Sequence, residues 1–131
     1  MARPSRPIVV AHRGASANIA EHTLGAYVAA IDAGADALEC DVRLTADGHL
    51  VCVHDRDLKR TAASKGLVST QNLADLDALD FSSWKNPWAD LDDELPDRDP
   101  ALGKVLTMRR LLEVVAEQDR RIELSIETKQ P

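Results

Sequence analysis

The stretch that most constrains the fold is a candidate β-hairpin at residues 36–55, which spells DALECDVRLTADGHLVCVHD. Asp47-Gly48 is a strong signal for a two-residue type I′ turn, in which both central residues need φ > 0. Because side chains alternate along a strand, this turn places Asp41 directly across from His54. The predicted polar face carries Glu39, Asp41, Arg43, Cys52 and His54, and the predicted apolar face carries Leu38, Cys40, Val42, Leu44, Val51 and Val53.

A three-residue loop at the same place would slip the register by one residue and mix these two sets. We expect the register that keeps them apart. Taken alone, a strand with charged residues on one face is usually a solvated edge, so the polar face needs support from elsewhere in the chain. That support comes from a second polar cluster, His12-Arg13-Gly14, at the end of another apolar run.

A strand–helix–strand pattern leads into the hairpin. Residues 8–11 form a continuous apolar run, which is typical of a strand buried on both faces in a parallel sheet. Residues 23–33 repeat apolar side chains at intervals of three and four, with Thr23 at the capping position and Gly34 just past the end. We therefore expect a βαβ unit in which the strands at 8–11 and 37–42 are parallel neighbours.

The second half of the chain predicts fewer regular elements. We expect a short helix at 70–79, then an irregular excursion at 80–103 that is rich in proline, tryptophan and acidic residues. Thr107 caps a helix that runs to Gln118, followed by a strand at 121–129. The helix should bury Leu111, Leu112, Val114 and Val115, and Trp84 and Trp88 are expected to pack within the excursion.

Composition narrows the class of protein. The net charge of −6 argues against a nucleic-acid or anionic-membrane surface. The chain has no apolar run of about 18 residues and no signal-peptide core, so we expect no transmembrane segment. Cys40 and Cys52 fall on opposite faces of the expected hairpin and neither has a CxxC partner, which argues against a disulfide or a thiolate metal site. These features predict a cytoplasmic protein.

Polar residues recur where the predicted strands end. In parallel α/β folds, functional sites form at the carboxyl ends of the strands. If the three main strands are parallel, these side chains converge on one opening, to which the hairpin returns His54. The strand ends supply His12 and Arg13, Glu39 and Asp41, and Glu127 and Lys129.

The residue types at these ends fit phosphodiester chemistry. Glu39, Asp41 and Glu127 are hard oxygen ligands suited to Mg²⁺ or Ca²⁺, and without a cation they would repel one another. His12 and His54 can act as general acid and base. Arg13 and Lys129 can hold phosphate oxygens, although either alone would more often be a surface charge.

Four further polar residues lie beside or outside this cluster. Glu21 could bind a metal or basic groups in the opening, or simply favour the start of the following helix. Arg43 is a supporting member of the polar hairpin face. We expect His22 and His49, which lie outside the cluster, to be exposed.

These motifs, taken in order, resemble the glycerophosphodiester phosphodiesterase family. The matching set is HRG at 12–14, E-x-T at 21–23, E-x-D at 39–41, T-x-D-G at 45–48, HD at 54–55 and E-x-K at 127–129. The resemblance implies an α/β fold, the N-terminal part of a TIM (β/α)8 barrel, with an inserted excursion after the HD motif. Residues 1–131 would then be a single, incomplete barrel domain with its excursion at about 56–105.

The resemblance also implies a function. His12 and His54 would be the acid/base pair, Glu39, Asp41 and Glu127 the ligands of a divalent cation, and Arg13 and Lys129 the phosphate contacts. The family hydrolyses small-molecule glycerophosphodiesters to sn-glycerol 3-phosphate and an alcohol. The implied route is attack of the glycerol 2-hydroxyl on phosphorus, which gives a cyclic phosphate that water opens.

The chain departs from the family's pattern in two ways. The family often has P-E-N-T where this chain has Ala20-Glu21-His22-Thr23, which changes the loop and the side chain at the asparagine position. The chain also stops after the third expected barrel strand, so we expect an open edge at 122–127 that allows self-association. Two other functions stay open: a phospholipase-type barrel that releases a cyclic phosphate, and a catalytically incompetent fragment that acts by binding.

Overall fold

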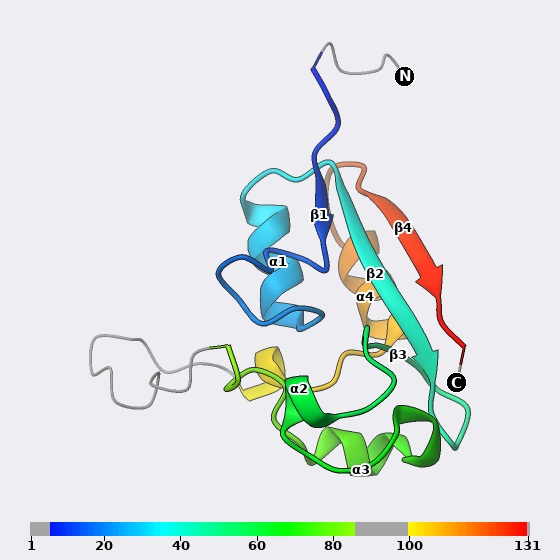
Figure 1. Ribbon diagram of the computed structural model, residues 1–131. Helices are drawn as coiled ribbons and strands as arrows, with labels where there is room; N and C mark the ends of the chain where they lie inside the picture. Colours follow the sequence, from blue (N-terminus) through cyan, green and yellow to red (C-terminus); the bar gives the residue numbers. More distant parts are fainter. Residues whose placement is uncertain (1–5, 86–99, 131) are drawn as a thin grey trace.

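The structure is a computed structural model that describes residues 6–85 and 100–130 (Figure 1). Its regular elements in chain order are β1 (Val10–His12), α1 (Leu24–Asp32), β2 (Ala37–Leu44), β3 (Leu50–Cys52), α2 (Lys59–Ala62), the 3₁₀ turn η1 (Val68–Thr70), α3 (Leu73–Asp77), the 3₁₀ turn η3 (Pro100–Gly103), α4 (Met108–Ala116) and β4 (Glu123–Thr128).

A four-stranded sheet organises the described part of the chain, with β2 at its centre. β1 and β4 are parallel to β2, and β3 is antiparallel to the C-terminal end of β2. Because Ala37 pairs with both β1 and β4, and Val42 with both β3 and β4, strands β1 and β3 share one edge of β2 and β4 lies on the other. The predicted β1–α1–β2 unit with parallel neighbouring strands is therefore confirmed.

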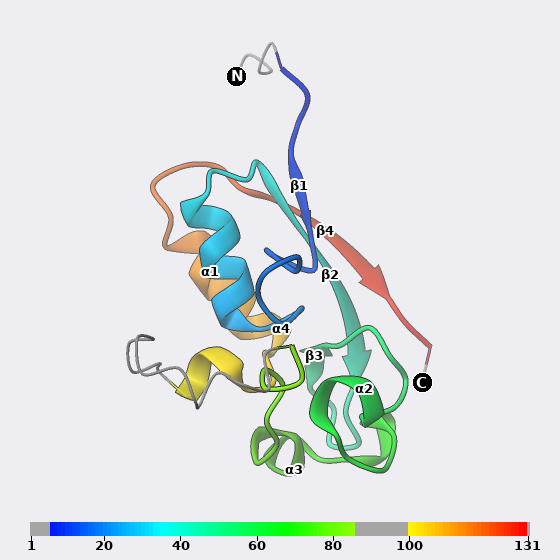
Figure 2. The same ribbon diagram turned by 60° about the vertical axis from the view of Figure 1, so that its left-hand side comes forward.

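Helices α1 and α4 cover one face of the sheet (Figures 1 and 2). Both helices begin where the sequence predicts, because the hydroxyls of Thr23 and Thr107 accept hydrogen bonds from the first helical turns. On α4 the predicted buried face is wrong at Leu112, which is exposed. The core between helices and sheet contains Tyr27, Ile31, Leu38, Cys40, Val42, Cys52, Leu106, Met108, Leu111, Val114 and Ile122.

The hairpin register is the main error of the sequence prediction. Leu44 pairs with Leu50 and Val42 with Cys52, so the strands are one residue out of the expected register. The connection is a loop of three residues, because Thr45 N donates to His49 O at 2.8 Å. Gly48 has φ +87°, but Asp47 does not have positive φ, so the expected type I′ turn does not form. Val53, not His54, therefore lies across from Asp41.

Contacts from outside the hairpin explain this loop. The Asp47 carboxylate accepts from the Thr45 hydroxyl at 2.7 Å and from Leu73 N at 3.0 Å, and Ala46 N donates to Gln71 O at 2.8 Å. The turn is thus held by the segment that begins α3. The slip also places Cys40 and Cys52 on one face, within the helix-covered core, where both are free thiols; the expectation that they face opposite ways is wrong.

A second, smaller core lies between β3 and the segment around α2, η1 and α3. The predicted helix at 70–79 is shorter than expected, and Asn72 caps it in a capping box with Asp75. Helix α2 was not predicted. The described parts of the excursion, 80–85 and 100–103, are turns and a 3₁₀ turn, and Trp88 lies outside the described residues. This core contains Val51, Val53, Leu58, Val68, Leu76 and Phe81.

Strand β1 is more exposed than its apolar sequence predicts. Ile8, Val9 and Val10 are each about half exposed, because β1 lies at an edge of the described sheet and not between two strands. The expectation of a strand buried on both faces is therefore wrong. The expectation that β4 lies at an edge is confirmed, since it pairs only with β2 in the described chain.

Candidate active site

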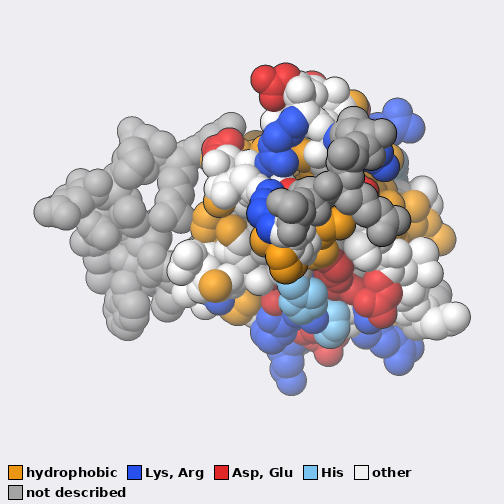
Figure 3. Space-filling view, turned by 90° about the horizontal axis from the view of Figure 1, so that it is seen from above, with side chains coloured by type: hydrophobic (Ala, Val, Ile, Leu, Met, Phe, Trp, Pro, Cys, Tyr) orange, Lys and Arg blue, Asp and Glu red, His pale blue; other side chains and the backbone are white. Residues whose placement is uncertain are grey.

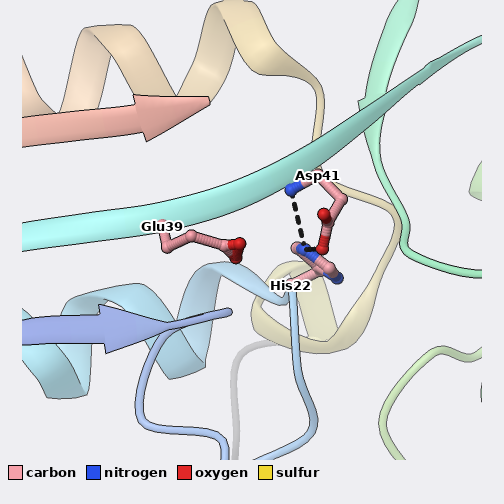
Figure 4. Close-up of side chains that lie close together, drawn as sticks. All are labelled: His22, Glu39 and Asp41. Carbon is pink, nitrogen blue, oxygen red and sulfur yellow. Dashed lines mark hydrogen bonds and ion pairs between the residues drawn. The ribbon is translucent and has the colours of Figure 1, made fainter. Parts of the chain in front are cut away.

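Three side chains gather on the polar face of β2: His22, Glu39 and Asp41 (Figure 4). Glu39 and Asp41 point to the same side of the strand, as alternation requires, and His22 approaches from the loop before α1. Each offers one ligand atom, and these atoms lie within 4.8 Å of one another. Glu39 Oε1 and Asp41 Oδ2 are buried, and neither accepts a hydrogen bond from the described residues. Asp41 as a whole is only 1% exposed, so water does not take the place of a partner. Buried oxygens of this kind fit a bound cation.

Two residues with left-handed backbone conformation bring His22 to this position. Arg13 has φ 60° and His22 has φ 59°. Arg13 N donates to Glu39 O at 3.2 Å, and His22 N donates to Arg13 O at 3.0 Å. Gly14 has φ +83°, and a Cβ there would lie 2.8 Å from Ala26 Cβ, so only glycine lets the loop pack directly on α1. The HRG loop, the His22 loop and β2 are therefore held together through the backbone.

The prediction that His22 is exposed is wrong, because the residue is 5% exposed. Its Nε2 accepts a hydrogen bond from Asp41 N at 3.1 Å and lies 3.2 Å from Asp41 Oδ2. The sequence carried one signal that could have found it. His22 is the middle residue of the E-x-T motif at 21–23. Histidine, like asparagine, adopts positive φ more readily than most residues, so this position could have been expected to turn the chain back towards β2.

Positive side chains surround Asp41. Arg13 Nε lies 3.5 Å from Asp41 Oδ2, and Lys129 Nζ lies 3.8 Å from Asp41 Oδ1. Lys129 N also donates to Val42 O at 3.0 Å, which ties the end of β4 to β2. The structure thus places both predicted phosphate contacts beside the Asp41 carboxylate.

Glu21 is buried behind this cluster and is held by two guanidinium groups. It accepts from Arg60 at 2.8 and 3.1 Å and from Arg13 at 3.1 Å. Burial alone would raise the pKa of Glu21, but hydrogen bonds from His22 and Arg60 and the charges of Arg60 and Arg13 outweigh it and hold the pKa well below its usual range. Glu21 is therefore an ionised carboxylate that supports the cluster.

Arg60 is a second residue that the sequence prediction missed. Besides Glu21, it binds Asp55 at 2.9 and 3.1 Å, and its guanidinium lies 5.2 Å from the Trp84 ring centroid. Hydrogen bonds from Arg60 and, less strongly, from His54 lower the pKa of Asp55. No motif marked Arg60 in the sequence. Its role is visible only in the structure, where Arg60 lies between Asp55 of the HD motif and Glu21 and binds both.

The two predicted catalytic histidines lie at the ends of β1 and β3. His12 is exposed, and it pairs in register with Glu39. His54 is part-buried, and its Nδ1 lies 2.9 Å from Asp55 Oδ1. Because ionised Asp55 can only accept, His54 Nδ1 donates and Nε2 carries the lone pair when the ring is neutral. In the view from above, histidine side chains lie next to one another among acidic and basic ones (Figure 3).

Glu127 and Arg43 lie near the cluster without belonging to it. Glu127 is the cross-strand partner of Asp41, but its side chain is 60% exposed and pairs with Lys129 Nζ at 2.8 Å. Arg43 donates to His54 O at 2.7 and 3.0 Å and to Gln130 O at 2.6 Å. Arg43 therefore anchors the HD loop and the chain after β4 to β2.

Comparison with known proteins points to one family. Residues 12–131 match the model of the glycerophosphoryl diester phosphodiesterase family. The chain is 50% identical over 125 residues to the protein named probable glycerophosphodiester phosphodiesterase 1 of Mycobacterium tuberculosis, covering 95% of this chain and 43% of that protein. The chain therefore spans less than half the length of this curated relative.

Solved structures give the same result. The chain superposes on glycerophosphodiester phosphodiesterase from Agrobacterium tumefaciens with a TM-score of 0.77 and 32% identity, covering 95% of this chain and 48% of that one. It also matches a phosphodiesterase from Oleispira antarctica, solved with its product sn-glycerol 3-phosphate, with a TM-score of 0.76 and 31% identity, covering 94% and 45%. The predicted fold class, part of a TIM barrel, is confirmed. In the described residues, no helix is both long and apolar enough to cross a membrane.

Proposed function

Because the chain belongs to the glycerophosphoryl diester phosphodiesterase family, we propose that its polar cluster takes part in metal-dependent hydrolysis of glycerophosphodiesters to sn-glycerol 3-phosphate and an alcohol. One observation carries this proposal: Glu39 and Asp41, neighbours on the polar face of β2, each have a buried oxygen without a hydrogen-bond partner in the described chain, and Arg13 and Lys129 lie beside the Asp41 carboxylate. Acidic oxygens that need a cation, next to bases that can bind phosphate, form a site suited to a phosphodiester.

Glu39 and Asp41 would hold the divalent cation, with Glu127 as a third carboxylate from the neighbouring strand. Glu127 is the cross-strand partner of Asp41, which places it next to the cluster. Its carboxylate would bind the cation in place of its present partner, Lys129. Carboxylate oxygens on their own suit Mg²⁺ or Ca²⁺. When bound, the cation would offset negative charge on the phosphodiester oxygens. Arg13 and Lys129 would bind the remaining phosphate oxygens.

His12 and His54 would exchange protons with the substrate. One imidazole takes the proton of the glycerol 2-hydroxyl as its oxygen attacks phosphorus, and the other gives a proton to the departing alkoxide. The product of this step is a cyclic phosphate and the free alcohol. In the second step the roles reverse: water loses its proton to the imidazole that protonated the alkoxide and attacks phosphorus, the bond to the glycerol 2-oxygen breaks, and the other imidazole returns its proton to that oxygen. Asp55 holds the His54 ring so that Nε2 is the atom that exchanges the proton.

Binding without turnover is a second candidate function. It is favoured by one observation, that the Glu127 side chain is exposed and paired with Lys129 and does not join Glu39 and Asp41. The Oleispira structure with sn-glycerol 3-phosphate supports the first function by naming the expected product class.

Phosphorus NMR of glycerophosphocholine, incubated with the chain and Mg²⁺ or Ca²⁺, separates these possibilities. A signal from sn-glycerol 3-phosphate supports the proposal, whereas a cyclic phosphate that persists indicates phospholipase-type chemistry. Saturable substrate binding without turnover indicates a binding role. Where turnover is seen, His12→Ala or His54→Ala should lower kcat by at least about 10²-fold. His49→Ala is the matched control and should leave the rate unchanged, because His49 is exposed and lies in the hairpin turn beside Asp47.

A further inference from the structure

His22 adds a nitrogen to a site that the sequence predicts to contain only oxygen ligands. Its ring is almost fully buried, and Nε2 is 3.2 Å from Asp41 Oδ2, which is buried and accepts no hydrogen bond within the part of the chain that the structure describes. Glu39, which also has an unpartnered buried oxygen, completes the group. Three donor side chains from two segments therefore face a common point on β2 (Figure 4).

The tautomer of the neutral His22 ring is the one that a metal ligand needs. A ligating imidazole must present a lone pair. His22 Nε2 accepts the hydrogen bond of Asp41 N at 3.1 Å, so this nitrogen carries no proton, and a bound cation would take the place of that N–H at its single lone pair. The proton of the neutral ring is therefore on Nδ1. The Nε2 lone pair and Asp41 Oδ2 are both electron-rich, and a cation that both of them contact would remove their repulsion.

The other ring nitrogen has the support that metal-binding histidines usually have. His22 Nδ1 lies 3.6 Å from Glu21 Oε2, and Glu21 is fixed in turn by Arg13 and Arg60. Ligating histidines commonly direct the second nitrogen at a carboxylate, which fixes the tautomer and makes the ligating nitrogen more basic. This arrangement gives Glu21, which the sequence left open between two roles, a specific one.

We propose that His22 is a direct ligand of the cation, and that the site prefers a first-row transition ion such as Mn²⁺ to Mg²⁺ or Ca²⁺. This inference rests on the proposed function, whose cation site it specifies. Imidazole binds transition ions well and binds Mg²⁺ and Ca²⁺ poorly, whereas carboxylates bind all of these ions. An asparagine at position 22, which the family often has, offers an oxygen instead and would remove this preference.

Isothermal titration calorimetry and pulsed electron paramagnetic resonance of the untagged chain test the proposal. Wild-type protein loaded with Mn²⁺ should show coupling to ¹⁴N from an imidazole. His22→Asn should lose that coupling and bind Mn²⁺ at least about tenfold more weakly, since even the loss of a supporting residue costs a metal site about 10–100-fold. Its affinities for Mg²⁺ and Ca²⁺ should change far less, because the asparagine oxygen replaces the nitrogen.

His49→Asn is the matched control, because His49 is exposed and lies at the hairpin turn, and it should keep both the coupling and the Mn²⁺ affinity. Asparagine tolerates the positive φ of position 22, and an unchanged thermal unfolding midpoint verifies that His22→Asn is folded. If Mn²⁺ binds the wild-type chain without ¹⁴N coupling, the inference is overturned and the proposed function stands. If Mn²⁺, Mg²⁺ and Ca²⁺ all fail to bind, the proposed function itself is overturned.

Discussion

Glu21→Gln should destabilise the protein and should do so in a pH-dependent way. The carboxylate is 8% exposed and accepts three charge-assisted hydrogen bonds from Arg60 and Arg13. Glutamine keeps one acceptor oxygen, but its amide N–H groups would face guanidinium N–H groups. Removing one partner of a buried pair costs about 3–5 kcal/mol. Because the Arg60 side chain is 40% exposed, solvent screening reduces the expected loss to about 2–3 kcal/mol.

The pH dependence follows from the direction of the pKa shift. The pKa of Glu21 in the folded protein lies well below its value of about 4.3 in an unfolded chain. The stabilisation from this carboxylate is therefore fully present above about pH 4.3, and it is lost as pH falls towards the folded pKa. The difference between wild type and Glu21→Gln should thus be largest at pH 7. It should shrink by about 1–2 kcal/mol by about pH 3, at about 1.4 kcal/mol per pH unit.

Urea unfolding followed by circular dichroism, repeated between pH 3 and 7, measures both effects. Glu123→Gln is the matched control, because Glu123 is exposed and pairs with Arg121 only at 3.6 Å, so it should change stability by less than about 0.5 kcal/mol. The reasoning is refuted if Glu21→Gln matches wild type at pH 7 within that margin. It is equally refuted if the difference between the two proteins is the same at every pH.

Three other changes test the site, its loop and its sheet edge. Asp41→Asn should abolish divalent-ion binding in calorimetry, because it removes the buried carboxylate nearest His22, and unchanged affinity would exclude Asp41 as a ligand. Gly14→Ala should cost about 2–4 kcal/mol in urea unfolding, since strain at positive φ adds to a clash with α1; Gly48→Ala, with similar φ and open space, should cost clearly less, and equal losses would exclude the clash. We also expect self-association through edge strand β4, which Ile126→Lys should reduce in sedimentation velocity; a wild-type chain that stays monomeric at all concentrations would contradict this.

Local signals predicted the framework of the fold well. Thr23 and Thr107 cap their helices because a hydroxyl in extended conformation satisfies the first helical N–H groups, and this depends only on neighbouring residues. The parallel pairing of β1 and β2 follows from the helix between them, which a short connection forces back across the sheet. Glu39 and Asp41 were found because alternation places them on one face of β2.

Long-range contacts decided what the sequence could not predict. The Asp47-Gly48 pair favours a two-residue turn by itself, but Leu73 N and Gln71 O bind the loop from a distant segment and select the longer connection. His22 is buried because the fold holds its loop against β2, where Asp41 N donates to its ring. The exposure of Val10 likewise depends on which strands lie beside β1, and this cannot be predicted from the apolar residues of β1 itself.

Arg60 connects the two loops that support the site. The loop after β1 carries Glu21, which supports His22, and the loop after β3 carries Asp55, which orients His54. Arg60 donates two hydrogen bonds to each of these carboxylates, so a shift of either loop breaks charge-assisted bonds to the other. Because strand β2 contacts both loops through its backbone, the cluster on β2 and the His54 ring are held in one frame. A change at Arg60 should therefore disturb His22 and His54 together, whereas a change at Asp55 removes the contact to His54 and leaves the two hydrogen bonds from Arg60 to Glu21 in place.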